Sequence, residues 1–277
     1  MFKRFSKQKR PQIVATIGPA SASIHTLEKM IDAGMNVARL NFSWGSHDEH
    51  RALIVAIREA AKNRGVRIPI IQDLSGPRVQ GKHGHSFDHH FGSHSGPHGV
   101  LTDKDLQDLN FGAIQKIDYV AMSFVGNEKD IIFLRKEMKA RGYKAPIIAK
   151  IEREEALHNL DAIIKETDAV MVARGDLGNE VPLEQIPFIQ LGIIRKAKKA
   201  KKSVITATQM MLTMTENPLP TRAEVTDVAY AVLDGSDAVM LSEESAQGKY
   251  PVEVVDMMRK IVIEAEGHMR ETAFHLL

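Results

Sequence analysis

Residues 147–176 read IIAKIEREEALHNLDAIIKETDAVMVARGD, and this stretch decides the fold. It holds two short apolar runs, Ile147–Ile151 and Ala169–Ala173, with the longer, helix-like stretch 153–167 between them. Apolar runs that lack strict alternation are typical of parallel strands covered on both faces. The stretch therefore predicts one strand–helix–strand unit of a parallel sheet.

The same alternation of strands and helices extends along the whole chain. Eight strands are predicted, at residues 13–17, 37–42, 69–74, 119–124, 147–151, 169–173, 203–208 and 238–242. Helix-like stretches lie between them, among them 46–64, 128–141, 153–167 and 187–201. Ser46 and Asn127 can serve as N-caps, and Gly65 and Gly142 follow predicted helices. This α/β pattern fits either a doubly wound sheet or a (β/α)8 TIM barrel. The barrel fits the count and the length better, because such barrels run to about 250 residues, so we expect residues 1–277 to form a single barrel.

Composition excludes several classes of protein. The 277 residues are 43% apolar and 26% charged, which is ordinary for a globular protein and excludes intrinsic disorder. No window approaches 18 consecutive apolar residues, and the basic first residues lack the apolar segment of a signal peptide. Lysine and arginine number 37 against 35 acidic residues, so no nucleic-acid partner is expected. Without cysteine there is no disulfide and no thiolate metal site, and we expect a cytoplasmic protein with no membrane partner.

One segment departs from this alternation of strands and helices. Residues 81–99, GKHGHSFDHHFGSHSGPHG, hold six of the twelve histidines and almost no aliphatic residue, which predicts a loop. Histidines one and two residues apart could bind Zn²⁺ or Ni²⁺ loosely, or could reach phosphates above the strand ends. Because histidine tracts are compositional signals only, a flexible Gly/Ser/His hinge is favoured.

Polar and ionic residues gather where the predicted strands end. In a barrel enzyme, the loops after the carboxyl ends of the strands carry the chemistry. A single charged residue at a strand end is usually a solvated rim residue, but here six strands contribute. The residues are Arg39, Asn41, Ser43, Asp73, Ser75, Lys150, Glu152, Arg174, Gly175, Asp176, Thr206, Thr208, Gln209, Ser242 and Glu244. Because buried charges must be paired or metal-bound, we expect a functional cluster.

The residue types at these positions indicate a chemistry. Glu152 and Asp176 are hard oxygen ligands for a divalent ion such as Mg²⁺ or Mn²⁺, which keeps waters and takes substrate oxygens. Arg39 and Lys150 supply fixed positive charge for a phosphate or a developing enolate. The amides of the RGDLG turn around Asp176 suit a carboxylate, and the Thr208 hydroxyl can orient a proton donor. These groups predict an anionic oxyacid held on a metal, with an enolate intermediate.

The sequence resembles pyruvate kinase. The similar stretches lie in family order and cover nearly the whole chain, apart from the first ten residues and the histidine-rich segment. They are IVATIGPAS (13–21), GMNVARLNFSWGS (34–46), IAKIE (148–152), VMVARGDLG (170–178), TATQM (206–210) and PTRAEVTDVAYAVLDGSDAVMLSEESAQGKYP (220–251). The joint presence of PTRAE, AVLDG and MVARGDLG is highly specific.

The resemblance implies phosphoryl transfer between phosphoenolpyruvate and ADP, giving pyruvate and ATP, with Mg²⁺ as cofactor. It implies that Arg39 contacts the transferred phosphoryl group, that Lys150 stabilises the enolate, and that Thr208 takes part in substrate binding and enolate protonation. It further implies Glu152 and Asp176 as Mg²⁺ ligands.

Other residues match the family in less central places. The substrate turn corresponds to Ala173, Arg174 and Gly175, and the proton-relay region to Ser242 and Glu244. The positions that bind K⁺ in the family correspond to Asn41, Ser43, Asp73 and the carbonyl of Leu74.

The sequence departs from the family pattern in its domains and in the stretch that binds the nucleotide. Only residues 81–99 stand where the family inserts a lid domain, and no segment corresponds to the C-terminal effector domain, so a minimal form is expected. Trp44 replaces the histidine of the family's NFSHG, and the family's TKGPEIR reads LSGPRVQ here at 74–80. In the family, a basic residue at the position of Arg78 accompanies independence of K⁺, so K⁺ is expected to be dispensable.

Three functions stay open from the sequence. The leading one is a Mg²⁺-dependent pyruvate kinase of glycolysis. The second is a metal-dependent lyase or decarboxylase that forms a pyruvate enolate from oxaloacetate or a pyruvate aldol. The third is a non-catalytic phosphoenolpyruvate-binding protein, against which the retention of Lys150 and Thr208 argues. A homodimer through the barrel helices is favoured over the family tetramer, with a monomer as the alternative.

Overall fold

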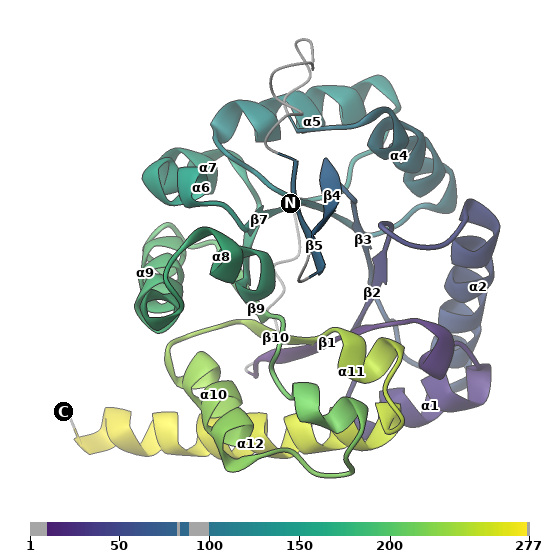
Figure 1. The fold of residues 1–277 in the computed structure, drawn as a ribbon. Helices are drawn as coiled ribbons and strands as arrows, with labels where there is room; N and C mark the ends of the chain where they lie inside the picture. The colour runs from purple at the N-terminus through teal and green to yellow at the C-terminus, as the bar shows by residue number, and fades with distance from the viewer. Residues whose placement is uncertain (1–9, 82–83, 89–99, 276–277) are drawn as a thin grey trace. The chain divides into compact units, whose positions relative to one another are not determined.

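The computed structural model describes residues 10–81, 84–88 and 100–275 (Figure 1). Its barrel strands are β1 (Gln12–Thr16), β2 (Val37–Asn41), β3 (Ile70–Asp73), β6 (Tyr119–Met122), β7 (Ile147–Ile151), β8 (Ala169–Ala173), β9 (Ser203–Ala207) and β10 (Ala238–Leu241). Among the described residues these strands close into a parallel barrel in the order β1-β10-β9-β8-β7-β6-β3-β2. The predicted TIM barrel is confirmed.

All the predicted strands are present, and the differences lie at their ends. The strands are buried along nearly their whole length, which explains why the sequence shows apolar runs in place of alternation. The run predicted at 119–124 ends as a strand at Met122, because Phe124 adopts a left-handed backbone with φ of 57°. The chain leaves the sheet there, two residues earlier than its apolar character suggests.

The chain divides into two compact units. The first comprises the residues up to Leu40, Arg51–Pro69 and the residues from Ser203 on. Its helices are α1 (Ile24–Ala33), most of α2 (His47–Asn63), α10 (Arg222–Leu233), α11 (Glu243–Ala246) and α12 (Pro251–His275), with short 3-10 turns η1 (Pro19–Ser21) and η3 (Leu212–Thr215). Within this unit, α12 packs along α10 and α1 (Figure 1).

The second unit comprises Asn41–His50 and Ile70–Lys202. Its helices are α4 (Asp103–Gln115), α5 (Glu128–Ala140), α6 (Glu154–His158), α7 (Leu160–Glu166), α8 (Arg174–Glu180) and α9 (Ile186–Lys199), with the 3-10 turn η2 (Leu183–Gln185) before α9. Asn127 caps α5 as predicted, and its side chain accepts a hydrogen bond from Lys129 N.

One predicted helix is broken. The stretch 153–167 forms two helices, α6 and α7, that meet at Asn159. The Asn159 amide Nδ2 donates to Gly126 O at 3.0 Å and to Glu155 O at 3.2 Å. An asparagine side chain that bonds nearby carbonyls competes with the regular helical hydrogen bonds, so the helix is interrupted at this residue.

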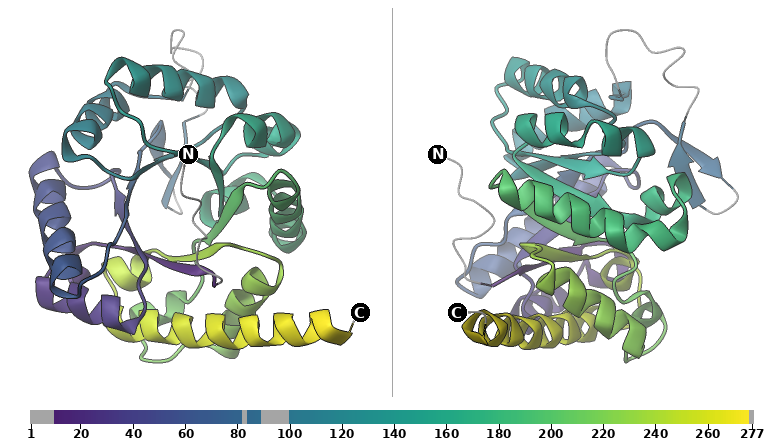
Figure 2. Two further views of the ribbon diagram at one scale, coloured as in Figure 1. Left: turned by 180° about the vertical axis from the view of Figure 1, so that it is seen from behind. Right: turned by 90° about the vertical axis from the view of Figure 1, so that its left-hand side faces the viewer.

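A hairpin follows the third barrel strand. Strands β4 (Arg78–Gly81) and β5 (Gly84–Phe87) pair antiparallel, with Arg78 opposite Phe87. Figure 2 shows this hairpin from the side. The prediction of a loop over 81–99 is therefore wrong for Gly84–Phe87, because cross-strand pairing with β4 supplies an order that composition does not reveal. Residues 82–83 and 89–99, with most of the histidines, lie outside the described residues.

Candidate active site

The residues gathered in the second unit centre on Lys150, near the end of β7. Its ammonium Nζ lies 2.8 Å from Glu152 Oε1 and 3.1 Å from Asp73 Oδ1, and it donates to Ser123 Oγ at 2.7 Å. All four side chains are buried. A buried ammonium is tolerated only when it is paired and hydrogen-bonded. The ends of β3, β6 and β7 therefore hold one positive charge among oxygen acceptors, and Lys150 and Glu152 lie on the same side of their strand, as their spacing predicts.

Asp176 adds a second carboxylate beside Glu152. It lies in the first turn of α8, directly after β8. Burial, followed by the negative charge of Glu152, raises the pKa of Asp176 to about 7, while Lys150 and Arg78 act in the opposite direction. A buried carboxylate whose pKa is raised beside a second carboxylate is a place where added positive charge is stabilising.

This carboxylate pair fits a divalent cation. Glu152 Oε1 accepts no hydrogen bond from the described residues, and it lies 2.8 Å from the Lys150 ammonium. Within the described part of the chain, no group of three or more histidines and carboxylates could hold a metal ion. Mg²⁺ is commonly bound by one or two carboxylates, with waters and substrate oxygens completing its shell. Glu152 and Asp176 are thus the residues that would hold such an ion.

Ser123 belongs to this cluster and was missed by the sequence reasoning. Its hydroxyl donates to Leu74 O at 2.7 Å and accepts from Lys150 Nζ. The position of Ser123 directly after β6 is visible in the sequence. A single serine beside charged strand ends is nevertheless weak evidence for a functional role. Its importance comes from the contact with Lys150, which is 27 residues away in the chain.

The oxygens expected to bind K⁺ lie in the same unit. The Asn41 Oδ1 atom accepts a hydrogen bond from Ser43 N at 3.1 Å, and Ser43 Oγ is buried with no hydrogen-bond partner among the described residues. Asp73 and the carbonyl of Leu74 already contact Lys150 and Ser123, respectively. Part of the expected oxygen set therefore faces an ammonium and a hydroxyl of the protein itself.

Arg78 points toward the carboxylates. Its Nε donates to Ser75 O at 2.8 Å, and its Nη2 lies 3.5 Å from Ser123 Oγ and 4.0 Å from Asp176 Oδ2. The side chain is only 15% exposed. The guanidinium is a fixed positive charge at the edge of the Lys150 cluster.

The substrate turn predicted at Ala173, Arg174 and Gly175 joins β8 to α8. Ala173 is the N-cap residue of α8, and the helix begins at Arg174. Arg174 Nη1 lies 3.4 Å from Gln190 Oε1 on α9. The RGDLG turn therefore opens the short helix α8.

The first unit holds the other predicted residues. Arg39, at the end of β2, is buried, and its Nη1 donates to Thr16 Oγ1 at 3.0 Å. Thr16 Oγ1 donates in turn to Leu241 O at 2.8 Å. Thr208 follows β9 with a left-handed backbone, φ of 69°, and its hydroxyl donates to Ala207 O at 2.6 Å. Non-glycine residues in this conformation are uncommon and cluster at functional sites.

Ser242 and Glu244 connect two strand ends of the first unit. Glu244 accepts hydrogen bonds from Ser242 N at 2.7 Å and from Met211 N at 3.1 Å. Burial raises the pKa of Glu244. The Ser242 hydroxyl is buried and has no hydrogen-bond partner among the described residues. Glu244 thus holds the segment after β9 to the segment after β10.

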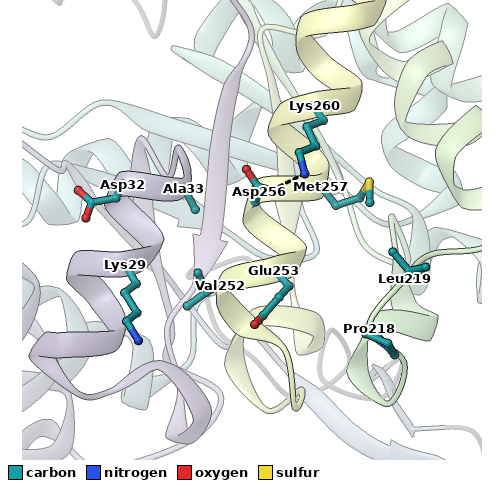
Figure 3. Close-up of a pocket in the computed structure, with 10 residues that line it drawn as sticks. All are labelled: Lys29, Asp32, Ala33, Pro218, Leu219, Val252, Glu253, Asp256, Met257 and Lys260. Atoms are coloured by element: carbon teal, nitrogen blue, oxygen red, sulfur yellow. Dashed lines mark ion pairs between the residues drawn. The ribbon is translucent and has the colours of Figure 1, made fainter.

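A surface cavity of about 460 Å³ in the first unit is a separate feature (Figure 3). Residues of α1 and α12 line it, together with Pro218 and Leu219. Three of its charged groups have ion-pair partners, since Asp256 pairs with Lys260 and Arg259, and Asp32 pairs with Arg64. None of the residues predicted from the strand ends lines this cavity.

Comparison with known proteins identifies the family. The family model described as the pyruvate kinase barrel domain matches residues 8–98 and 94–255. The chain belongs to the pyruvate kinase family. It is 37% identical to a pyruvate kinase of Sporosarcina psychrophila over 336 residues, and 38% identical to one of Geobacillus stearothermophilus. In both comparisons, 94% of this chain and 57% of the relative are covered.

The comparison also shows how this member differs from its pyruvate kinase relatives. The chain spans 57% of the length of these curated relatives. The alignment extends over 336 positions, more than the 277 residues of the chain, so the relatives hold residues inside the matched span that this chain lacks. The two matched parts of the pyruvate kinase barrel model meet at 94–98, in the histidine-rich segment. This is the place where the sequence predicts that the family's lid domain is missing.

Proposed function

We propose that this chain transfers the phosphoryl group of phosphoenolpyruvate to a nucleoside diphosphate such as ADP, giving pyruvate and ATP, with Mg²⁺ or Mn²⁺ as cofactor. The observation that carries the proposal is the buried Lys150 ammonium, held by Asp73, Ser123 and Glu152 beside the carboxylate of Asp176. Membership of the pyruvate kinase family supports the same chemistry. Phosphoenolpyruvate and ADP are substrates of glycolysis, and the proposal therefore includes a cytoplasmic location.

The proposed reaction breaks the bond between phosphorus and the enol oxygen of the substrate. The electron pair stays on the enol oxygen, and phosphorus bonds to a terminal oxygen of the diphosphate. Lys150 stabilises the negative charge on the enolate, because a positive charge fixed before the reaction needs no reorganisation. A bound divalent ion would supply Lewis-acid stabilisation of the charged oxygens.

Roles for the remaining residues complete the proposal. Arg39, oriented by its hydrogen bond to Thr16, contacts the transferred phosphoryl group. Thr208 orients the donor of the proton that converts the enolate carbon to the methyl group of pyruvate. The substrate carboxylate binds at the turn formed by Ala173, Arg174, Gly175 and Asp176, and Ser242 is a further proposed substrate-binding residue.

A second function is supported by a residue difference in the stretch that binds the nucleotide in the family. Trp44 stands where the family has histidine, and its side chain is 57% exposed. If the chain does not accept a nucleoside diphosphate, the same Lys150 cluster can serve a metal-dependent lyase or decarboxylase, since either reaction forms a pyruvate enolate. A protein that only binds phosphoenolpyruvate would form no enolate.

The deciding experiment measures ATP made from phosphoenolpyruvate and ADP, beside the decarboxylation of oxaloacetate. Lys150→Met should lower ATP formation at least about a hundredfold, judged from single oxyanion donors in other enzymes. It should also lower the free energy of unfolding by about 3–5 kcal/mol, because Asp73 and Glu152 lose their buried partner. The assays are therefore run at a temperature where the variant is folded.

Lys196→Met is the matched control, since Lys196 is an exposed lysine on α9 paired with Asp161. A Lys150→Met protein that keeps most of its activity would contradict the proposal. Decarboxylation without ATP formation would favour the lyase, and binding of phosphoenolpyruvate without either product would favour the binding protein.

A further inference from the structure

Phe124 has a strained backbone beside the proposed metal ligand. It follows β6 with φ of 57°, in the left-handed region that a non-glycine residue occupies at a cost of about 1–2 kcal/mol. In this conformation its amide donates to Glu152 Oε2 at 2.7 Å. Such strain persists only where the surroundings fix the residue. The groups that hold Phe124 therefore act on the Oε2 oxygen of Glu152, while Lys150 contacts its Oε1 oxygen.

The β4–β5 hairpin supplies two of these groups from a single cross-strand pair. Arg78 and Phe87 lie directly opposite each other in the hairpin. The Arg78 guanidinium lies over the Phe124 ring, 4.9 Å from its centroid, and the Phe87 ring lies 5.4 Å from that centroid at a tilt of 53°. Both geometries are favourable for cation–π and aromatic contacts. The cross-strand pair of Arg78 and Phe87 thus contacts the ring of Phe124.

Arg153 secures the hairpin from the other side. Its guanidinium lies 3.9 Å from the centroid of the buried Phe87 ring, and its Nη1 lies 3.4 Å from Phe124 O. Gly76 leaves the room that the Phe124 ring needs, since a Cβ at that position would lie 2.9 Å from Phe124 Cδ2. The Phe87 ring is consequently enclosed between Arg153 and Phe124.

We infer that Phe87 is a positioning residue of the proposed active site, which holds the Phe124 ring so that the strained Phe124 amide orients Glu152 toward the cation. The short hairpin thereby takes a part in building the metal site. The inference rests on the proposed function only in treating Glu152 as a metal ligand. Groups that orient a metal ligand through a hydrogen bond change metal affinity when they are removed.

The test measures Mn²⁺ binding by electron paramagnetic resonance, with no substrate or nucleotide present. Phe87→Ala should weaken Mn²⁺ binding about tenfold or more. Hydrogen exchange of the Phe124 amide should also become faster. Phe87→Tyr keeps the ring and should bind Mn²⁺ like the parent. Val79→Ala is the matched control. Val79 lies in the same hairpin, is 40% exposed and belongs to a different cross-strand pair, with Ser86 opposite it.

A folded Phe87→Ala protein with parental Mn²⁺ affinity and parental exchange at Phe124 would overturn the inference and leave Phe87 as packing alone. If Phe87→Ala does not fold, Phe87→Leu keeps apolar volume without the ring, and the same comparison is made with it. A parent chain that binds no Mn²⁺, or binds it equally after Glu152→Gln, also overturns the inference. Failure of the proposed function is distinct, because it shows as absent ATP formation in a parent chain whose Mn²⁺ binding responds to Phe87.

Discussion

At the scale of single residues, the direction of Arg78 decides a question that the sequence poses. The side chain lies against Ser75 O, Ser123 and Asp176 and is largely buried, so its positive charge acts within the carboxylate cluster. A guanidinium is permanently charged. It can therefore contribute the positive field that a bound K⁺ supplies elsewhere in the family.

We predict that activity is largely independent of K⁺. Rates measured in K⁺ and in tetramethylammonium salts at equal ionic strength should be similar. Arg78→Glu should lose activity or become dependent on K⁺, because it replaces the fixed positive charge by a negative one. A stimulation of the parent chain by K⁺ of an order of magnitude would contradict this expectation.

His50 is a second residue whose surroundings matter more than its type. Its ring stacks on Phe42 with 3.9 Å between centroids, and its Nε2 lies 2.9 Å from Trp44 O. Burial lowers the pKa of His50. Of the charged groups that act on it, Asp108 opposes this shift, whereas Lys104 and His47 add to it. The folded protein therefore holds His50 neutral at a pH where the unfolded chain protonates it.

This difference predicts a loss of stability in mild acid. Below a pH of about 6.5, the ordinary histidine value, the unfolded chain binds a proton that the folded protein does not, so the free energy of unfolding falls until the folded pKa is passed. His50→Gln removes this contribution. Urea unfolding at pH 7.5 and 5.5 should show a smaller decrease for the variant. An equal decrease in both proteins would assign the acid sensitivity to other groups.

At the scale of elements, Glu224 joins the start of α10 to the 3-10 turn η3. Its carboxylate accepts hydrogen bonds from Thr221 N and from Thr213 N, each at 2.8 Å, while Thr221 Oγ1 accepts from Glu224 N at 3.2 Å. This is a capping box that also anchors a neighbouring turn. The PTRAE stretch therefore has a structural reason for its Thr and Glu, apart from any role in substrate binding.

We predict that Thr221→Ala lowers the free energy of unfolding by about 1 kcal/mol, as loss of an N-cap does. Glu224→Ala should lower it further, because the Thr213 amide also loses its acceptor. Thr226→Ala, at an exposed position of the same helix, should stay within about 0.5 kcal/mol of the parent. Urea titrations followed by circular dichroism measure all three. Equal effects at Thr226 and Glu224 would contradict the anchoring role.

At the scale of the whole molecule, the Lys150 cluster forms in a chain that lacks residues which its relatives hold within the matched span. The cluster rests on barrel strands β3, β6 and β7, of which β6 pairs with both β3 and β7. Its geometry thus depends on the sheet. No helix in the described residues combines the length and apolar character needed to cross a bilayer. The exposed apolar side chains of the second unit include Leu183 and Phe188, both 76% exposed.

We predict a homodimer that uses the barrel helices around α9. Exposed apolar groups close together in the chain favour association, because their burial releases ordered water. Light scattering coupled to size exclusion should report twice the chain mass for the parent and a monomer for Phe188→Asp. Ile114→Asp on α4, exposed to a similar degree at 75%, is the control. A monomeric parent at micromolar concentration would contradict the prediction.

The barrel fold and the strand ends that carry polar residues could both be predicted from the amino-acid pattern. Strand bounds such as Ile147–Ile151 and Ala169–Ala173 agree between prediction and structure. The common side of Lys150 and Glu152 also follows from their spacing. These features are local, since apolar periodicity and strand alternation act over a few neighbouring residues.

Which side chains contact one another could not be predicted in this way and became clear from the folded chain. The contact of Ser123 with Lys150, the inward direction of Arg78 and the enclosure of the Phe87 ring join parts of the chain far apart in sequence. The break at Asn159 likewise depends on Gly126, 33 residues away. Such contacts are fixed when the strands align side by side, because packing and the pairing of buried charges select partners that no local pattern contains.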